Sequence, residues 1–198
     1  MVNKLNVLPD VGSSSSLNQI ELQQLNYSIN VKQRLAYTEP NFDITYPQSI
    51  REQFNAIATI SNDTITPISL IISSYGGEIY GMLGILDIFK QMPMPIHTVG
   101  IGAVMSAATM VLAAGEKGHR KIGRNTQVMI HQLSTWLEGT SGNILNEANQ
   151  IRSLQQLLNE ILAEHSNQNK SFWAKKASKN LYLTPQQCVD YGLADVII

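Results

Sequence analysis

The 198-residue sequence has few of the features that mark specialised classes of protein. A single cysteine, Cys188, excludes an internal disulfide and is typical of proteins from a reducing compartment. The 14 basic and 15 acidic residues nearly cancel, so we predict no surface for polyanions and no nucleic-acid partner. No apolar stretch of about 18 residues is present, and residues 1–10 lack the long apolar core of a signal peptide. We therefore expect a cytoplasmic protein with no membrane partner.

Motifs for metals and cofactors are also missing. The 4 histidines are scattered, and with 1 cysteine they form neither an H-E-x-x-H pair nor paired C-x-x-C motifs. We therefore predict no metal and no cofactor. His97 and His165 are expected to be core or hydrogen-bonded histidines, and His119 is expected to be a solvated turn residue.

The composition and pattern of the chain predict one α/β domain with an extension. Hydrophobic residues make up 43% of the chain, which is enough for one substantial core. We expect a flexible extension at residues 1–25, marked by Ser13–Ser16, and a domain at residues 26–198. Strand and helix patterns alternate along this domain. The expected elements include a strand within 30–37, a helix from Pro47 to about Ile60, a strand over 67–74, a helix over 79–89, a strand over 96–101, a helix from Ser106 to Gly115 and a strand over 125–131.

Two later helices have clear signals of their own. Apolar residues over 144–162 recur at helical spacing and predict a long amphipathic helix within about 139–165. From spacing alone, packing against the core is the favoured role of this helix. The sequence Thr-Pro-Gln-Gln at 184–187 predicts a capping box at the start of the last helix, and Gly192 follows its end.

Ser106 stands at the junction between a predicted strand and a predicted helix. A serine at this position is, by itself, more often only a helix cap. The first N–H groups of a helix have no intrahelical acceptor, so the N–H of Ala107 and the helix dipole can hold an oxyanion beside the serine hydroxyl. The glycines Gly76 and Gly77 follow another predicted strand, and the N–H of Gly77 can supply a second donor. These residues predict a nucleophile with an oxyanion hole.

His131 ends an apolar strand pattern and is the candidate base for Ser106. At this point the chain resembles a known family, the proteolytic subunits of the ATP-dependent Clp protease, within the ClpP/crotonase fold. The segments around Gly76, Ser106 and His131 carry the resemblance, with the C-terminal sequences Tyr-Leu-Thr and Tyr-Gly-Leu-Ala-Asp. The resemblance covers residues 67–198. It implies an α/β fold of repeated strand-strand-helix units with a protruding strand-helix handle at about 133–165.

The resemblance also implies a function. A member of this family is a serine endopeptidase that hydrolyses unfolded polypeptides inside a chamber, which two stacked seven-membered rings of identical subunits enclose. Ser106 would be the nucleophile, and Gly76, Gly77 and Ala107 would form the oxyanion and substrate-binding site. The handle would join the two rings. The sequence has no G-x-x-x-x-G-K-[ST] phosphate loop, so a separate Clp-family AAA+ ATPase would have to drive unfolding.

The largest departure from the family falls on the third member of its catalytic triad. Asn180 occupies the position of the family's aspartate. The Oδ1 of an asparagine can accept the Nδ1–H of His131 and orient the ring, but it lacks the charge that stabilises an imidazolium. The resemblance therefore implies a working but slower triad of Ser106, His131 and Asn180. Judged on residue type alone, a loop asparagine is more often a turn or cap residue.

Other departures concern recognition and assembly. Tyr75 replaces the proline before the glycine pair, Met105 replaces the small residue before the serine, and Leu-Ser-Thr-Trp at 133–136 replaces Pro-Leu-Gly-Gly. Because these groups line the implied substrate groove, we expect a preference for hydrophobic substrate side chains. Ser178-Lys179 replaces an acidic-basic pair that the family uses between subunits, so ring contacts are expected to differ.

Two alternatives stay open on the sequence. Asn180 and the altered groove also fit a catalytically weak or inactive subunit, with a structural or regulatory place in a mixed Clp assembly. A crotonase-type acyl-CoA enzyme shares the fold and uses paired backbone donors. That enzyme class does not need the spacing of Ser106 and His131, however, and no carboxylate pair replaces them in this sequence.

Overall fold

The computed structural model describes residues 19–198, so the predicted polar segment Ser13–Ser16 lies outside the described residues. In the described part, one sheet of seven strands has the order β1-β2-β3-β4-β7, and β5 and β6 branch from β3. All strand pairs are parallel except β5 with β6. The strands are β1 (Leu35–Tyr37), β2 (Ile68–Ser74), β3 (Ile96–Met105), β4 (Arg120–Ile122), β5 (Gln127–Ile130), β6 (Leu181–Leu183) and β7 (Val196–Ile197).

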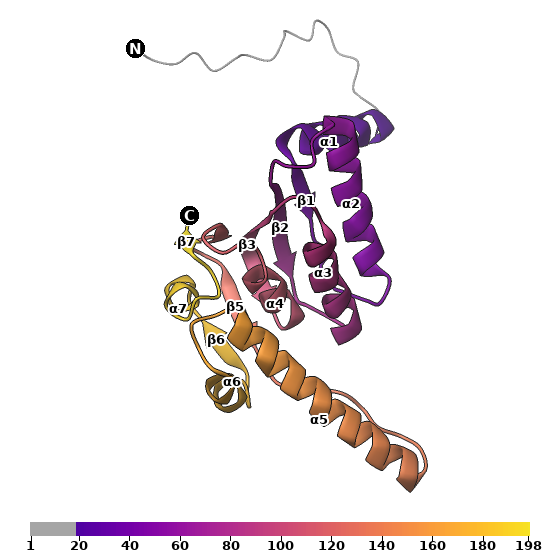
Figure 1. Ribbon diagram of the computed structural model, residues 1–198, viewed down its shortest axis with the longest axis vertical. Coiled ribbons are helices and arrows are strands. Elements are labelled where there is room, and N and C mark those ends of the chain that lie inside the picture. Colours follow the sequence, from indigo (N-terminus) through magenta and orange to yellow (C-terminus); the bar gives the residue numbers. More distant parts are fainter. Residues whose placement is uncertain (1–18) are drawn as a thin grey trace, which may run out of the picture.

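The helices cover the sheet and extend beyond it (Figure 1). Helices α2, α3 and α4 pack on one face, while α6 and α7 lie beside β6 near the C-terminus. The last helix begins with the predicted capping box. The helices are α1 (Gln19–Gln33), α2 (Tyr46–Ser61), α3 (Ile79–Gln91), α4 (Ala107–Ala113), α5 (Ser141–Glu164), α6 (Lys170–Lys176) and α7 (Pro185–Asp190). The predicted α/β class is confirmed.

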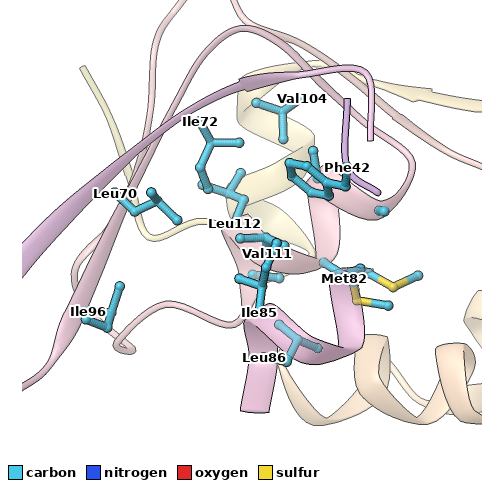
Figure 2. Packing of buried hydrophobic residues seen from close by; sticks show 14 of the residues in the cluster. Phe42, Leu70, Ile72, Met82, Ile85, Leu86, Ile96, Val104, Val111 and Leu112 are labelled. Atoms are coloured by element: carbon cyan, nitrogen blue, oxygen red, sulfur yellow. The ribbon is translucent and has the colours of Figure 1, made fainter. Parts of the chain in front are cut away.

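The core lies between the sheet and the helices α2, α3 and α4. Alternate residues of β2 point into it, because side chains of a strand alternate between the two faces of the sheet. Ile72 of β2, Ile85 of α3 and Leu112 of α4 are fully buried, and Figure 2 shows how they gather with their neighbours. Burying one such side chain stabilises a fold by about 1.5–3 kcal/mol. This packing fixes the ends of β2 and β3 relative to each other.

Strand β3 belongs to two parts of the sheet because it bends near Gly102. Its first half pairs with β4, and its second half, from Ala103 to Met105, pairs with β5. Gly102 has a φ of 64°, in the left-handed region that favours glycine. The bend carries the end of β3 toward the ends of β2 and β5. Residues far apart in the sequence therefore meet where these strands end.

The N-terminal part of the structure differs from the sequence prediction. Residues 30–33 belong to α1, so the strand predicted within 30–37 is wrong for those residues, and only Leu35–Tyr37 is a strand. Arg34 separates the two elements with a φ of 56°, and its guanidinium donates to the carbonyl oxygens of Thr66 and Pro67. Because contacts with residues distant in the sequence support this change of backbone direction, the local periodicity of apolar residues does not predict it. Residues 19–25, predicted as part of the extension, form the start of α1.

A long arm extends from the body of the molecule (Figure 1). We use this name for residues 132–157, which include the segment after β5 and most of α5. No residue of the arm is buried, whereas Leu158, Ile161 and Leu162 at the other end of α5 are. The segment before α5 runs beside the helix without forming a strand, and the backbone N–H of Leu133 donates to Gln155 Oε1 at 2.7 Å. The predicted long helix is confirmed, but only its last turns pack against the core.

The C-terminal end of the chain is held by a buried ion pair. The Arg120 guanidinium donates to both carboxylate oxygens of Asp195, at 2.6 and 2.9 Å. The same guanidinium donates to the carbonyl oxygens of Ala113 and His165, at the ends of α4 and α5. One side chain thus joins four segments. No helix within residues 19–198 combines the length and the apolar character needed to cross a membrane.

Candidate active site

Ser106 lies at a sharp turn between β3 and α4. Its φ of 54° and ψ of −125° are sparsely populated by residues other than glycine. Holding a non-glycine residue in such a conformation costs about 1–3 kcal/mol and is a feature of functional turns. A serine on a strained turn from strand to helix exposes its hydroxyl at the end of the sheet, as in the nucleophile elbow of α/β-hydrolases.

Neighbouring backbone groups hold this turn in place. The N–H of Ser106 donates to the carbonyl oxygen of Met129 on β5 at 2.7 Å, and the hydroxyl of Thr109 donates to the carbonyl oxygen of Val104 at 3.0 Å. Thr109 is completely buried, so its hydroxyl contributes to this local network without exposure to water. Hydrogen bonds to β3 and β5 therefore hold this turn in its strained conformation.

The side chain of Ser106 does not cap α4, although a capping role is the common one for a serine at this position. Instead, its Oγ lies 2.9 Å from Nε2 of His131. That distance is within the range expected for a hydroxyl and the base that removes its proton. The structure therefore brings together the predicted nucleophile and the predicted base. Both side chains are half-buried, which leaves them accessible to a ligand.

The glycine pair lies directly against the serine turn. A Cβ atom at Gly76, whose φ is 90°, would come within 2.9 Å of the Cβ of Ser106 and even closer to backbone atoms of the same turn. Gly77 forms a parallel bridge with Phe42, and the N–H of Phe42 donates to the carbonyl oxygen of Gly76 at 2.7 Å. Only glycine fits this close approach. The segment around Phe42 thus fixes the position of the glycine turn.

Two backbone donors face the space beside Ser106. Gly77 and Ala107 both line a cavity of about 80 Å³ that also contains Ser106 and His131. In the described residues, the N–H groups of Gly77 and Ala107 donate to no protein acceptor. Ala107 is the first residue of α4, so its N–H has no partner within the helix. The two N–H groups remain available to an oxygen atom in the cavity.

Asn180 lies close to His131 in the sheet but does not bind it. β6 pairs with β5 so that Leu181 stands opposite Ile130, which places Asn180 beside His131 in the same antiparallel register. The Asn180 side chain is exposed, and in the structure as described no hydrogen bond joins it to His131. An antiparallel neighbour of this kind lies within reach of a rotamer change. Its predicted role in orienting the imidazole stays a prediction.

The remaining histidines and the cysteine lie elsewhere. His97 and His119 stack on each other, with ring centroids 4.2 Å apart. Burial, together with nearby positive charge from His119 and Lys121, lowers the pKa of His97. Burial raises the pKa of the Cys188 thiol to about 12, so this residue is unsuited to nucleophilic chemistry. Within residues 19–198, no group of three or more histidine, cysteine or acidic side chains is arranged to hold a metal ion.

Sequence reasoning missed three residues that shape this site. Phe42 positions the glycine turn, Thr109 supports the serine turn, and Gln155 of α5 accepts the N–H of Leu133, two residues after His131. None of them lies in a periodic pattern that indicates such a role. The one available signal was Leu133 itself, because a leucine in place of the family's proline adds a backbone N–H that needs an acceptor.

Comparisons with known proteins show what this chain is similar to. A family model described as Clp protease matches residues 23–198. The chain is 33% identical over 138 residues to the ATP-dependent Clp protease proteolytic subunit 1 of Prochlorococcus marinus subsp. pastoris (strain CCMP1986 / NIES-2087 / MED4), which covers 70% of each chain. It is 31% identical over 142 residues to the ATP-dependent Clp protease proteolytic subunit of Paracoccus denitrificans, covering 72% of this chain and 71% of that one.

Proposed function

Because this chain belongs to the Clp protease family and is a serine-type peptidase, we propose that Ser106 and His131 are its nucleophile and base. The observation that carries this proposal is the distance of 2.9 Å between Ser106 Oγ and His131 Nε2, at a turn where the serine does not cap its helix. We propose that the substrates are unfolded polypeptides, hydrolysed by endopeptidase chemistry.

The proposed reaction begins when Ser106 Oγ attacks a peptide carbonyl carbon while His131 Nε2 takes the hydroxyl proton. The N–H groups of Gly77 and Ala107 stabilise the negative oxygen of the tetrahedral intermediate, and Gly76 allows the backbone to approach closely. His131 then gives its proton to the leaving amine, which departs and leaves an acyl ester on Ser106. Water attacks this ester with His131 again as base, which releases the acid and restores the serine.

We propose Asn180 as the residue that orients His131, on the basis of its place opposite His131 in the sheet register. Its amide oxygen can hold the correct tautomer, but it carries no charge to stabilise the imidazolium. In a serine protease, the exchange of aspartate for asparagine lowers kcat by about 10⁴. Asn180→Asp is therefore expected to increase kcat. An unchanged or lower rate would remove Asn180 from the triad.

The exposed position of Asn180 also favours a second candidate function, a catalytically weak or inactive subunit within a mixed Clp assembly. Labelling with a fluorophosphonate separates the two. The proposal predicts covalent modification of Ser106, located by mass spectrometry, and loss of labelling in Ser106→Ala. Ser153→Ala, which removes an exposed hydroxyl on the arm, serves as the matched control and should label as the wild type does. Absence of labelling on Ser106 in every assembly state would favour the inactive subunit.

We further propose that the protein is cytoplasmic and forms two stacked heptameric rings, with the arm as the contact between rings. The support is the arm itself, which extends from the body with apolar side chains such as Leu145 and Trp136 66% and 85% exposed. A second copy is the occupant that the family resemblance implies for such a surface. A separate Clp ATPase would supply unfolded chains, since the sequence has no phosphate loop.

The contact between rings can be tested on the arm. Leu145→Glu places a charge on its apolar surface and is expected to convert double rings into single rings, as measured by sedimentation velocity. Gln150→Glu introduces the same side chain at another exposed position of α5 and should leave the assembly intact. Equal sedimentation of the two variants would show that the arm does not join the rings.

A further inference from the structure

His97 and His119 form a stacked pair that the proposed reaction does not use. Their ring centroids lie 4.2 Å apart, and the angle between the ring planes is only 2°. The sheet brings the two residues together. Thr98 of β3 pairs with Arg120 of β4 in a parallel register, and His97 and His119 stand opposite each other one position earlier in that register. The backbone therefore fixes the two histidines side by side.

The pair lies on the face of the sheet that points away from the core. Ile96 belongs to the packed core (Figure 2), and Thr98 is completely buried. Because side chains of a strand alternate between the two faces of the sheet, His97 points to the opposite face. His97 is half-buried and His119 is exposed, so protons from the solvent can reach both rings.

The stack holds the turn between α4 and β4 against β3. In this turn, which we define as residues 115–119, the N–H of Glu116 donates to the carbonyl oxygen of Ile96 at 2.8 Å. The N–H of His119 donates to the carbonyl oxygen of Glu116 at 2.9 Å, which closes the turn. The ring of His119 thus adds a side-chain contact to the backbone hydrogen bond between the turn and the start of β3.

The charges near the pair make a proton on each ring unfavourable. Burial lowers the pKa of His97, and the nearby positive charges of His119 and Lys121 lower it further. Glu116 acts in the opposite direction but does not offset them. Two imidazolium rings at this distance also repel each other, so the doubly protonated pair opposes its own stacking.

The other elements around the pair supply little charge that could compensate. The residue of β2 opposite His97 is the uncharged Ser69, and α4, which precedes the turn, has no charged residue. Lys117, another charged residue of the turn, lines a small cavity with Glu164 of α5. Among the described residues, Glu116 is therefore the carboxylate that acts on the pair.

The end of the turn next to β4 has an anchor that mild acid does not release. The N–H of Gly118 and the Arg120 guanidinium both donate to the Asp195 carboxylate. Although burial acts to raise it, the hydrogen bonds and the charge of Arg120 hold the pKa of Asp195 below its ordinary value. This carboxylate is therefore still ionised at pH 5, and β4 stays attached to the C-terminal segment while the histidines take up protons.

We propose that His97 and His119 form a pH-sensitive latch, which holds the turn 115–119 on β3 at neutral pH and releases it when both rings are protonated. This inference does not depend on the chemistry proposed for Ser106. Because the released turn binds protons more readily than the latched one, release is favoured as pH falls below the ordinary histidine pKa of about 6.5. A pKa difference of one unit changes an equilibrium tenfold, so we expect opening of the turn to increase by about three- to tenfold between pH 7.5 and pH 5.

Hydrogen exchange measured by mass spectrometry tests the latch on the wild-type protein. After correction for the intrinsic effect of pH on exchange, peptides that cover residues 115–119 should exchange about three- to tenfold faster at pH 5 than at pH 7.5. Peptides from the buried part of α2 should exchange equally at the two pH values. An equal increase in both regions would show a global loss of stability, and no increase in the turn would show that the stack does not respond to pH. Either result overturns the inference.

Variants separate the charge of the pair from its stacking. The double variant His97→Phe with His119→Phe keeps two aromatic rings that cannot take a proton, so its turn should exchange equally at both pH values. His165→Gln is the matched control, since it removes a half-buried histidine outside the pair, and it should keep the wild-type response. If the double variant does not fold, His119→Gln gives the same comparison at an exposed position. A response that persists without the pair, or that is lost in His165→Gln, overturns the inference.

Discussion

The two tryptophans of this chain occupy opposite environments. Trp173 in α6 is completely buried, packs edge-on against Phe172 and Tyr191, and donates from Nε1 to the hydroxyl of Ser166 at 2.9 Å. Trp136 in the arm is 85% exposed. In the body, contacts within one chain bury the tryptophan and provide its hydrogen bond. In the arm, the other tryptophan lies in solvent. This exposed apolar surface lies on the segment that we propose as the contact between rings.

Helix α5 shows the same difference along its own length. Its apolar positions keep one helical spacing over 144–162, yet Leu158, Ile161 and Leu162 are buried while Ile144 is 36% exposed. A periodic stripe predicts that a helix has an apolar face, but it does not tell what covers that face. We therefore expect buried contacts of the body to contribute more to folding than exposed contacts, on the arm or elsewhere on the surface.

The largest expected effect comes from the tryptophans. Trp173→Ala should lower the free energy of unfolding by about 3–5 kcal/mol, because it removes a large buried ring and leaves a cavity. Trp136→Ala should change it by no more than about 0.5 kcal/mol in single chains, since the side chain lies in solvent. Urea unfolding followed by circular dichroism, at concentrations where sedimentation shows single chains, measures both. Equal losses would contradict the proposed difference between body and arm.

A second test compares two ion pairs. Asp195→Ala leaves the buried Arg120 guanidinium without its partner and should lower the free energy of unfolding by about 3 kcal/mol. Glu160→Ala removes the partner of Lys170 in an exposed pair and should cost no more than about 1 kcal/mol. The same unfolding experiment measures both variants. A loss in Glu160→Ala as large as that in Asp195→Ala would show that burial does not govern these pairs.

The buried pair also predicts a dependence on pH. Burial acts to raise the pKa of Asp195, but hydrogen bonds from Arg120 and its charge outweigh this and hold the pKa below its ordinary value. Because folding lowers this pKa, the stabilisation is present above the unfolded-chain pKa of about 3.9 and is lost as pH falls through the lower folded value. The difference in stability between wild type and Asp195→Ala should therefore shrink below about pH 4. If this difference in stability stayed constant down to pH 2, the ionised Asp195 carboxylate would not be the source of the stabilisation.

Two glycines provide a third, smaller test. A Cβ at Gly81 would lie 2.2 Å from the carbonyl oxygen of Asp43, so Gly81→Ala should destabilise the body by about 1–3 kcal/mol. At Gly142 in the arm, no heavy atom lies within 4 Å of the added Cβ, and Gly142→Ala should stabilise the protein by about 0.5–1 kcal/mol through helix propensity. Thermal unfolding measures the change in stability of each variant. Changes of opposite sign would support the difference between body and arm, and changes of the same sign would contradict it.

The smallest effect is expected where the arm joins the body. Gln155→Leu removes the acceptor of the Leu133 N–H and should cost about 1 kcal/mol. Leu133→Pro removes the donor, so Gln155→Leu added to Leu133→Pro should cost almost nothing further. A double-mutant cycle in urea unfolding gives the coupling energy. Additive losses would show that the bond does not contribute to stability.

Much of the fold could be predicted from the sequence because its signals are local. The strand leading to Gly76, the helix after Ser106 and the capping box at 184–187 all depend on neighbouring residues, and the structure has each of them. Arg34 could not be placed in the same way, because its left-handed backbone is supported by contacts with Thr66 and Pro67. Long-range contacts decide such positions.

In the active site too, the sequence predicts some residues, whereas long-range contacts decide the position of others. The residue types and spacing of Ser106 and His131 predicted the pair that the structure places 2.9 Å apart. The contributions of Phe42 and Thr109 depend on contacts with backbone groups outside their own local segments, at Gly76 and Gly77 and at Val104, and no sequence pattern indicates them. Asn180 marks the limit of the resemblance, since alignment gives its position in the chain but not the conformation of its side chain.

The strained backbone of Ser106 has a consequence for how such subunits change over evolutionary time. With a φ of 54°, this position would relax if glycine replaced serine, so mutation toward glycine should be favoured wherever the hydroxyl has no use. A subunit that only filled a place in a ring would have nothing to lose by that replacement. Serine is therefore the more strained choice at this position, and the nucleophile that we propose is the use that its hydroxyl would serve.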